Sequence, residues 1–282
     1  MEFHNPGAEV YVPDGSPVDT ALTRTTHLAV AAHQDDIEIM AYHGILECFG
    51  RPGRGFTGVT VTNGSGSPRD GLYGDYTDEE MQVVRRKEQK KAAFVGDYSA
   101  HVFLDYSSSA IKDSANAQVV KDLKRIIAST KPQVIYTHNL ADKHDTHVAT
   151  ALRVIRALRE TPHDSRPQHL YGCEVWRSLD WVNDNDKVIF NVQAHENLAM
   201  SLVGVFDSQV CGGKRYDLAT MGRRRANATY LASHGVDEST SLIFGTDLTP
   251  LMEDDRLDAG EYIRGFINRF AQEVSNRIAK LA

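Results

Sequence analysis

The sequence predicts an α/β fold in which a mostly parallel sheet lies between two layers of helices. Two observations support this prediction. Short apolar runs alternate with segments of helical period over roughly the first 160 residues, which is the pattern of successive βα units. The first of these runs, "HLAVAA" at 27–32, is almost wholly apolar, as expected of a strand that is buried on both faces of a sheet. Together they indicate a Rossmann-like three-layer α/β/α arrangement.

The elements follow in the order of this alternation. Strands are predicted at 27–32, 56–62, 101–106 and 132–138, with helices near 37–49, 78–95, 115–129 and 147–160. The helix from 78 to 95 has the clearest ends, because Thr77 and Glu80 fit a capping box and Gly96 supplies a stop. Beyond Pro162 the pattern loosens, and "KVIFNV" and "SLIFGT" are predicted as strands.

The domain organisation predicted for the chain is simple. Residues 1–26 are irregular and rich in Pro, Gly, Asp and Thr, and we expect this N-terminal extension to wrap the domain surface or an interface. No clean linker follows, so residues 27–282 are expected to form one domain, with a core at 27–160 and a less regular part at 161–282. The 282 residues, 41% of them hydrophobic, suffice for a sizeable core.

Two patterns near the C-terminus are interpreted as structural. Residues 259–281 carry apolar side chains at helical spacing, which we interpret as a core-facing stripe: Ile263, Phe266, Ile267, Phe270, Val274 and Ile278. The basic run Arg223-Arg224-Arg225 is interpreted as a solvated helix face, since short charge runs usually are.

Composition excludes several classes of function. The formal charge of −7 argues against a nucleic-acid partner, because no broad basic surface is evident. No apolar stretch approaches a membrane span, and the N-terminus lacks the pattern of a signal peptide, so a cytoplasmic protein without a membrane partner is expected. Cys48, Cys173 and Cys211 are widely spaced and suggest neither a disulfide framework nor a sulfur-rich metal site.

The chemistry is expected just after the strands, because an open parallel sheet binds ligands beyond the carboxyl ends of its strands. Polar side chains follow all four predicted strands: His33, Gln34, Asp35 and Asp36; Asn63; Asp105; and His138, Asp142, His144, Asp145 and His147. The first and fourth groups are dense in histidine and carboxylate, which supply the nitrogen and oxygen ligands suited to zinc.

Each group has a plainer interpretation when taken alone. Aspartates after a strand commonly begin a helix, where capping and the helix dipole favour them. Histidines three residues apart, as in His144 and His147, can lie on an exposed helix face. Because both groups end strands of one sheet, on one edge, the pair favours a metal site. Zinc is the expected ion, although two histidines and an aspartate also accept Fe²⁺, Co²⁺ or Ni²⁺.

Five segments resemble, in the same order, motifs of the PIG-L (LmbE-like) zinc-dependent deacetylases. They are "AHQDDIE", "TNGSGS", "RRKEQKKAAFVG", "FLDY" and "THNLADKHDTH", and they span residues 27–160. The C-terminal part, including "FDSQ" at 206–209, is only loosely similar. The resemblance is specific for the family and much less so for the substrate.

The resemblance implies roles for five residues. His33, Asp36 and His147 are implied as zinc ligands, and Asp35 as the general base that accepts a proton from metal-activated water. His144 is implied beside the developing oxyanion or the leaving group. Such a site hydrolyses an amide, and the implied reaction removes an acetyl group from an N-acetylated amino sugar (GlcNAc-type) or its conjugate.

The resemblance also implies substrate contacts. Arg85 and Asp105 are implied to bind sugar hydroxyls, although an ordinary i, i+3 pair with Glu88 is an equal interpretation of Arg85. Asn63 is a weaker candidate. His43 lies where relatives commonly carry glycine, and it either narrows the sugar pocket or is a surface helix residue.

The chain departs from the family pattern within both metal-binding motifs. Gln34 replaces the usual proline, at an expected cost in loop rigidity but not in ligands. "HDTH" replaces "HPDH", so the aspartate that tunes the first histidine in relatives is missing beside His147. Asp142 and Asp145 are the candidates to take its place at His144.

Other functions remain open at this point. The nearest are a zinc hydratase or a thiol-conjugate amidase on the same scaffold, and a non-catalytic sugar-binding relative. A nucleotide-binding module is weakly suggested by the glycine-rich "NGSGSPRDG", which is not GxGxxG and follows the second strand. The expected partner is a small N-acetylated sugar or glycoconjugate, and a homo-oligomer is compatible with the sequence.

Overall fold

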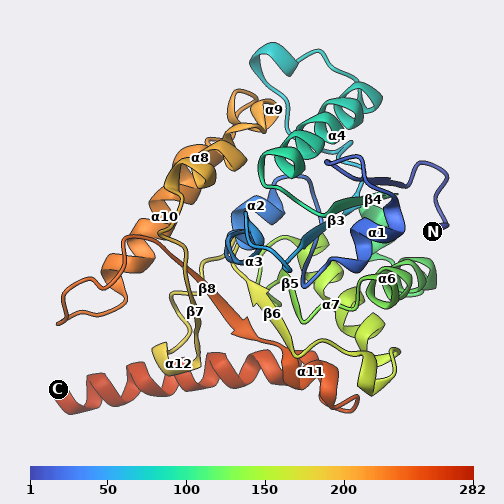
Figure 1. The fold of residues 1–282 in the computed structure, drawn as a ribbon. Helices are drawn as coiled ribbons and strands as arrows, with labels where there is room; N and C mark the ends of the chain where they lie inside the picture. Colours follow the sequence, from blue (N-terminus) through green and yellow to red (C-terminus); the bar gives the residue numbers. More distant parts are fainter.

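An eight-stranded sheet runs through residues 1–282, which the computed structural model describes in full (Figure 1). Its strands are β1 (Glu9–Tyr11), β2 (His27–Ala31), β3 (Phe56–Thr62), β4 (Ala100–Tyr106), β5 (Val134–His138), β6 (His169–Cys173), β7 (Val188–Asn191) and β8 (Leu242–Asp247). Their order across the sheet is β1-β4-β3-β2-β5-β6-β8-β7. Strands β4, β3, β2, β5 and β6 are parallel, and β1, β7 and β8 join at the edges through antiparallel pairs.

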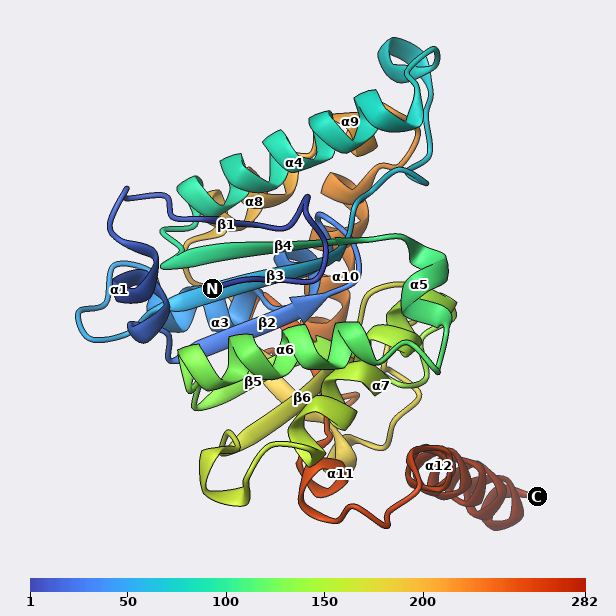
Figure 2. The same cartoon turned by 90° about the vertical axis from the view of Figure 1, so that its right-hand side faces the viewer.

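Helices cover both faces of this sheet, so the predicted α/β/α fold class is confirmed (Figure 2). They are α1 (Val18–Thr23), α2 (Asp36–Met40), α3 (Tyr42–Cys48), α4 (Asp78–Val95), α5 (Ser108–Lys112), α6 (Ala117–Thr130), α7 (Asp145–Arg159), α8 (Glu196–Gly204), α9 (Asp207–Val210), α10 (Tyr216–Tyr230), α11 (Thr249–Glu253) and α12 (Ala259–Leu281). Helices α1, α6 and α7 pack on one face, and α2, α3, α4 and α8 pack on the other. None of the helices has both the length and the apolar character that a membrane crossing needs.

The alternation of side chains along β2 explains how one short strand serves both layers. Leu28 and Val30 belong to the apolar cluster under α6 and α7, while Ala29 and Ala31 belong to the cluster under α2 and α3. All four are at most 1% exposed. The larger Leu28 and Val30 fill the space under α6 and α7, and the small Ala29 and Ala31 let α2 and α3 approach the strand closely.

Helix α4 begins and ends where its sequence predicts. The Thr77 hydroxyl accepts a hydrogen bond from the Glu80 backbone N–H (3.2 Å), and the Glu80 carboxylate accepts one from the Thr77 N–H (2.8 Å). Both halves of the capping box are therefore present, and Gly96 follows the last helical residue.

Two other segments differ from their predictions. The single helix predicted near 37–49 is two helices, because Ala41 leaves the helical conformation (φ −113°, ψ 20°) between α2 and α3. The N-terminal extension contributes β1, which pairs with β4 at the sheet edge, and Asn5 donates a hydrogen bond to the Leu104 carbonyl (2.8 Å).

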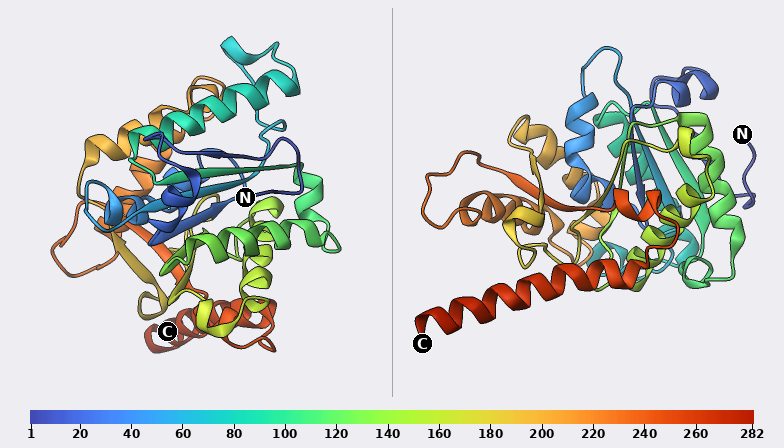
Figure 3. Two further views of the ribbon diagram at one scale, coloured as in Figure 1. Left: turned by 45° about the vertical axis from the view of Figure 1, so that its right-hand side comes forward. Right: turned by 90° about the horizontal axis from the view of Figure 1, so that it is seen from below.

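The interpretation of α12 as a core-facing stripe is wrong for most of its length. Only Ile263 and Phe266 are buried, whereas Ile267, Phe270 and Ile278 are 45%, 39% and 62% exposed. The helix packs at its first turns and then projects beyond the rest of the chain, as Figure 3 shows from below. Its periodicity correctly predicted one apolar face but could not tell what that face contacts.

The basic run in α10 is likewise not a uniformly solvated face. Arg224 is 2% exposed, donates hydrogen bonds to the carbonyls of Glu38 and Ile39 (2.7 and 3.1 Å), and lies over the Tyr42 ring. It joins α10 to α2, which positions α10 beside the polar edge of the sheet.

Candidate metal centre and active site

Both histidine-and-aspartate groups lie at the carboxyl ends of β2 and β5. Strands β2 and β5 are neighbours, and the sheet extends from them to opposite sides. On one side β3 and then β4 lie beyond β2, and on the other β6 lies beyond β5. In open α/β sheets, ligands bind in the crevice where the strand order reverses in this way. The fold therefore brings the two groups to the expected place.

The turn after β2 folds tightly so that His33 and Asp36 face one another. The backbone N–H of His33 donates a hydrogen bond to Asp36 Oδ2 (2.8 Å). Between them Asp35 adopts φ 87°, in the left-handed region that an aspartate enters at a cost of about 1–2 kcal/mol. This conformation ends the turn and lets α2 begin at Asp36.

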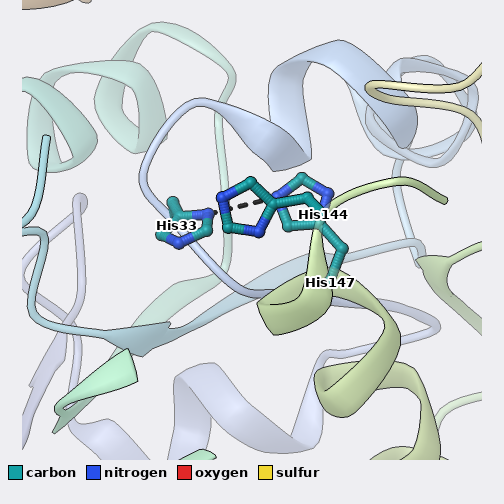
Figure 4. A group of neighbouring side chains, drawn as sticks. All are labelled: His33, His144 and His147. Carbon is teal, nitrogen blue, oxygen red and sulfur yellow. Dashed lines mark hydrogen bonds between the residues drawn. The ribbon is translucent and has the colours of Figure 1, made fainter. Parts of the chain in front are cut away.

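Three side-chain atoms, one from each predicted ligand, form a nearly equilateral triangle. His33 Nδ1 lies 3.2 Å from Asp36 Oδ2 and 3.1 Å from His147 Nε2, and those two atoms are 3.3 Å apart. Figure 4 shows the two imidazoles turned toward each other. Ligands about 2.0 Å from a tetrahedral ion are about 3.3 Å apart, so the triangle has the size of one face of a zinc site with its fourth position open.

A further histidine, His138, lies beside the triangle without belonging to it. Two groups of side chains have atoms close enough to share an ion. One is His33, His144 and His147, and the other is Asp36, His138 and His147, so His147 belongs to both. In the second group, His138 Nε2 accepts a hydrogen bond from the Ala32 backbone N–H (2.9 Å), so its lone pair is already used. The His138 ring instead stacks on His147, with centroids 3.9 Å apart, and fixes the plane of that imidazole.

Asp142 lies behind His147 on the side away from the triangle. Its Oδ2 is 3.6 Å from His147 Nδ1, the usual direction of the carboxylate that orients a metal-binding histidine. The same carboxylate accepts hydrogen bonds from the backbone N–H groups of His144 and Trp176. It therefore braces the loop between β5 and α7 and does not hydrogen-bond to the His144 ring. Asp145, the other candidate for that role, is exposed in the first turn of α7.

His144 completes the histidine group shown in Figure 4. Its ring stacks on His147 (centroids 4.6 Å apart) and meets His33 edge-on (5.0 Å), and its Nδ1 is buried without a hydrogen-bond partner. Burial and the neighbouring His147 and His33 lower the pKa of His144 to about 4. The ring is therefore a neutral hydrogen-bonding group at neutral pH.

Asp35 is held by an ion pair from the opposite helix. Arg85 Nη2 on α4 lies 2.7 Å from Asp35 Oδ2, and the Asp35 N–H donates a hydrogen bond to Gln89 on the same helix (3.2 Å). Burial raises the pKa of Asp35 to about 7, against the opposing charge of Arg85. No hydrogen bond in the chain engages its other oxygen, Oδ1.

Arg85 itself is 1% exposed and binds several groups of the chain. Besides Asp35, its guanidinium donates to Glu88 Oε2 (3.1 Å), to Ser208 Oγ (3.4 Å) and to the Gln34 carbonyl. Arg85 therefore makes the i, i+3 pair with Glu88 and also lies at the site. Arg85 ties α4, α9 and the turn after β2 into one unit.

A cavity of about 340 Å³ opens over these residues. Its lining comes from seven separate segments of the chain: His33, Asp35, Asp36, Gly64, Gly66, Ser67, Pro68, Arg85, Ser108, Lys112, His144, Thr146, Trp176, Gln209, Lys214 and Tyr216. Sequence reasoning missed the walls formed by Trp176, Gln209, Lys214 and Tyr216. The loosely similar "FDSQ", which ends at Gln209, was the one signal that pointed there.

Three predicted substrate residues do not line this cavity. The Asp105 carboxylate accepts a hydrogen bond from Arg86 Nη2 (2.8 Å) and lies against Gly7 of the N-terminal extension. Asn63 uses its side-chain oxygen to accept the Ser65 N–H (3.2 Å). His43 is part of α3, and its Nδ1 is 2.8 Å from the hydroxyl of Tyr136 in β5.

Comparisons with solved structures show the same fold. The hydratase GalB from Pseudomonas putida KT2440, a 4-carboxy-2-hydroxymuconate hydratase, is 14% identical over 79% of this chain and 96% of its own, with TM-score 0.61. N,N'-diacetylchitobiose deacetylase from Pyrococcus horikoshii is 18% identical over 77% and 82%, with TM-score 0.57. The A40926 pseudoaglycone deacetylase Dbv21 is 17% identical over 79% and 97%, with TM-score 0.59.

The sequence itself matches one family. No curated protein matches the chain. Residues 28–158 match the family described as PIG-L: GlcNAc-PI de-N-acetylase, and this range contains the whole triangle together with Asp35 and His144. Residues 28–158 are therefore a domain of the PIG-L (LmbE-like) family, whose members are deacetylases and hydrolases that act on amide bonds.

Proposed function

We propose that this protein is a divalent-metal-dependent hydrolase that removes the acetyl group from an N-acetylated amino sugar or its conjugate. The observation that carries the proposal is the triangle of His33, Asp36 and His147 atoms, 3.1–3.3 Å apart, with Asp35 beside it in a polar cavity. The family match supports amide hydrolysis. Two of the neighbours in fold are named as deacetylases of a chitobiose and of a glycopeptide pseudoaglycone, which favours a sugar-containing substrate.

The residues present fit a divalent ion. Two imidazole nitrogens and one carboxylate oxygen form the ligand set of the triangle, and Asp142 lies behind His147 as the carboxylate behind a metal-binding histidine usually does. Zinc suits this set best, while Fe²⁺, Co²⁺ and Ni²⁺ also accept it. When bound, such an ion polarises a carbonyl oxygen and lowers the pKa of a coordinated water toward about 7.

Asp35 is assigned the role of general base. Arg85 holds Oδ2, so Oδ1 is the oxygen left to accept a proton from the attacking water. The pKa of about 7 that burial produces is close to the optimum for a base at neutral pH. Because Arg85 and the left-handed backbone fix its direction, Asp35 needs no reorganisation during the reaction.

His144 is assigned to the oxyanion that develops as water attacks the carbonyl. Its lowered pKa makes the ring neutral at neutral pH, so it stabilises the oxyanion by donating a hydrogen bond. The departing amine takes the proton that Asp35 has accepted from the water, so His144 keeps its N–H. Its stacking on His147 and its edge contact with His33 hold it at the cavity wall.

The rest of the cavity suits a polar substrate. Trp176 offers an aromatic face for the C–H side of a sugar ring, and Lys112 and Lys214 stand at the walls for polar substituents. Arg85 lines the cavity as well, so a substrate contact there remains part of the proposal. Asp105, Asn63 and His43 would need to move from their present partners to make one.

A screen for acetate release tests the proposal. Zinc-loaded protein is incubated with N-acetylglucosamine, N,N'-diacetylchitobiose and N-acetylated glycopeptides, with chelator-treated protein as the control. Acetate should appear only with the metal-loaded protein, and readdition of metal should restore the activity. If metal-loaded protein releases no acetate from any of them, the proposal is wrong. A hydration assay on unsaturated carboxylic acids then tests the hydratase alternative, which the fold of GalB favours.

A further inference from the structure

A second, smaller cavity of about 100 Å³ adjoins the first. Most of its wall is apolar or aromatic and comes from five residues: Ile39, Val175, Trp176, Tyr216 and Ala219. Its other side chains are Thr220, Arg223, whose guanidinium is hydrogen-bonded to the Val175 carbonyl, and the carboxylates of Asp35 and Asp36. Away from the two carboxylates, the small cavity therefore offers an incoming group mainly apolar contact.

The two cavities meet at the reacting groups. Both are lined by Asp35, Asp36, Trp176 and Tyr216. Asp35 is the assigned base and Asp36 an assigned ligand, so the carbonyl carbon under attack must lie close to this shared wall. An amide carbonyl carries two substituents, and the protein supplies two separate spaces that meet at this wall.

The character of each space matches one side of the amide. The large cavity is lined mainly by polar and charged side chains and suits the hydroxylated amine part. The small cavity is the apolar one, and it suits the hydrocarbon of the acyl part. The acyl side is built mostly by segments outside residues 28–158, namely the residues after β6 and the first turns of α10.

The small cavity is larger than the methyl of an acetyl group requires. A group the size of a water molecule or a methyl takes about 30 Å³, so 100 Å³ holds about three of them. An acetyl methyl fills one third of that space. We propose that the small cavity is the acyl subsite and that it accepts acyl chains longer than acetyl, up to butyryl.

This inference rests on the proposed function and extends its substrate class to short-chain N-acyl amino sugars. The reaction itself is unchanged. Water adds to the acyl carbon, the C–N bond breaks, one proton passes to the amine, and a free carboxylic acid leaves with the amino sugar. No further reactant is needed.

A series of N-acyl glucosamines tests the inference on the metal-loaded enzyme. We expect kcat/KM to rise about fourfold for each methylene from acetyl through propionyl to butyryl, the gain for burying one methylene, and to fall at hexanoyl. If acetyl is cleaved and kcat/KM falls steadily with each added carbon, the inference is wrong and the proposed function stands. If no acyl group of any length is released, the proposed function is wrong.

A substitution in the cavity wall gives a second test. Ala219→Leu, in α10, fills part of the small cavity, and the butyryl-to-acetyl ratio of kcat/KM should fall by about tenfold. Ala271→Leu, the same change at a position of α12 that lines neither cavity, is the control and should leave the ratio as it is. An unchanged ratio in Ala219→Leu overturns the inference.

Binding of the acid product gives a readout that does not depend on turnover. Calorimetry of metal-loaded protein with acetate, propionate and butyrate should show affinity rising with chain length. Ala219→Leu should abolish that rise, while Ala271→Leu should keep it. Equal affinities for acetate and butyrate in the unsubstituted protein contradict an acyl subsite of this size.

Discussion

Arg85 and Asp35 form a buried ion pair, with guanidinium Nη2 2.7 Å from carboxylate Oδ2 and the two side chains 1% and 7% exposed. The pair joins the middle of α4 to the turn after β2. It fixes the carboxylate that stands beside the proposed ligands. The neighbouring Arg86 makes two ion pairs as well, but at the surface, which provides a matched comparison.

Removing the Arg85 guanidinium should lower the free energy of unfolding far more than removing the Arg86 guanidinium. Arg85→Ala leaves a buried carboxylate without its partner, so the free energy of unfolding should fall by about 3–5 kcal/mol. Arg86→Ala breaks only partly exposed pairs with Glu9 and Asp105 and should lower the free energy of unfolding by about 1 kcal/mol or less. Urea denaturation of both variants measures this difference. Equal losses would mean that the Asp35 pair adds nothing beyond a surface contact.

Asp35 and Asp36 should have separable roles although they are neighbours. Asp35→Asn keeps the size of the side chain but cannot accept a proton, so it should keep the metal and lose turnover by about 10²–10⁴-fold. Asp36→Asn should lose both the metal and turnover. Elemental analysis and kcat on the best acetylated sugar check these outcomes. Full activity in Asp35→Asn would assign the base elsewhere, and loss of metal in that variant would make Asp35 a ligand.

His147 and His138 should differ in metal binding although their rings stack. The unsubstituted protein should hold about one divalent ion per chain, and His147→Ala should hold almost none. His138→Gln should keep the ion, because His138 Nε2 is occupied by the Ala32 N–H and supplies no ligand atom. Elemental analysis of the purified variants measures this. A metal-free His138→Gln that is still folded by circular dichroism would move His138 into the ligand set.

Local sequence patterns predicted the elements that depend on local chemistry. The start of α4 follows from the Thr77 capping box and its end from Gly96, and β3 occupies the predicted residues 56–62. The break at Ala41 and the strand β6 were missed. The first lacks a local breaker, and the five residues of β6 include a glycine and a histidine and pair only with distant strands.

The same distinction applies to the site. Each proposed metal-binding motif is compact in sequence, and the parallel sheet places both motifs at one edge, so His33, Asp36 and His147 could be named together. The walls could not, because Trp176, Tyr216 and their neighbours come from loops and helices after residue 160 whose packing is set by tertiary contacts. Asp105 shows the converse: its position at the carboxyl end of β4 was predicted, but its partner Arg86 was not.

The buried histidines His101 and His27 should make the protein sensitive to mild acid. Burial lowers the pKa of His101 to about 3, and that of His27 to about 4. An unfolded histidine titrates near 6.5, so between about pH 6.5 and 4 the unfolded state binds more protons than the folded state. The destabilising effect of these two histidines is therefore absent above pH 6.5, and each of them lowers the free energy of unfolding by up to about 1.4 kcal/mol per pH unit as the pH falls.

His101→Gln should reduce this acid sensitivity. Glutamine still reaches the Thr60 hydroxyl that His101 contacts (2.9 Å) but does not titrate. Urea denaturation at pH 7.0, 6.0 and 5.0 should give a shallower decline for the variant than for the unsubstituted protein. His234→Gln, at an exposed loop position, serves as the control and should leave the decline as it was. Identical slopes for all three proteins would show that His101 is protonated alike in both states.

The two ends of α12 should respond differently to the same substitution. Ile263 is 9% exposed and packs with Phe266 and Phe244, so Ile263→Ala should lower the free energy of unfolding by about 2–4 kcal/mol. Ile278 is 62% exposed on the projecting part of the helix, and Ile278→Ala should change the free energy of unfolding by at most about 0.5 kcal/mol. Urea denaturation at low protein concentration measures both. A large loss for Ile278→Ala would show that the outer half of α12 is packed in solution, and a stability that rises with protein concentration would then identify a second copy of this chain as its partner.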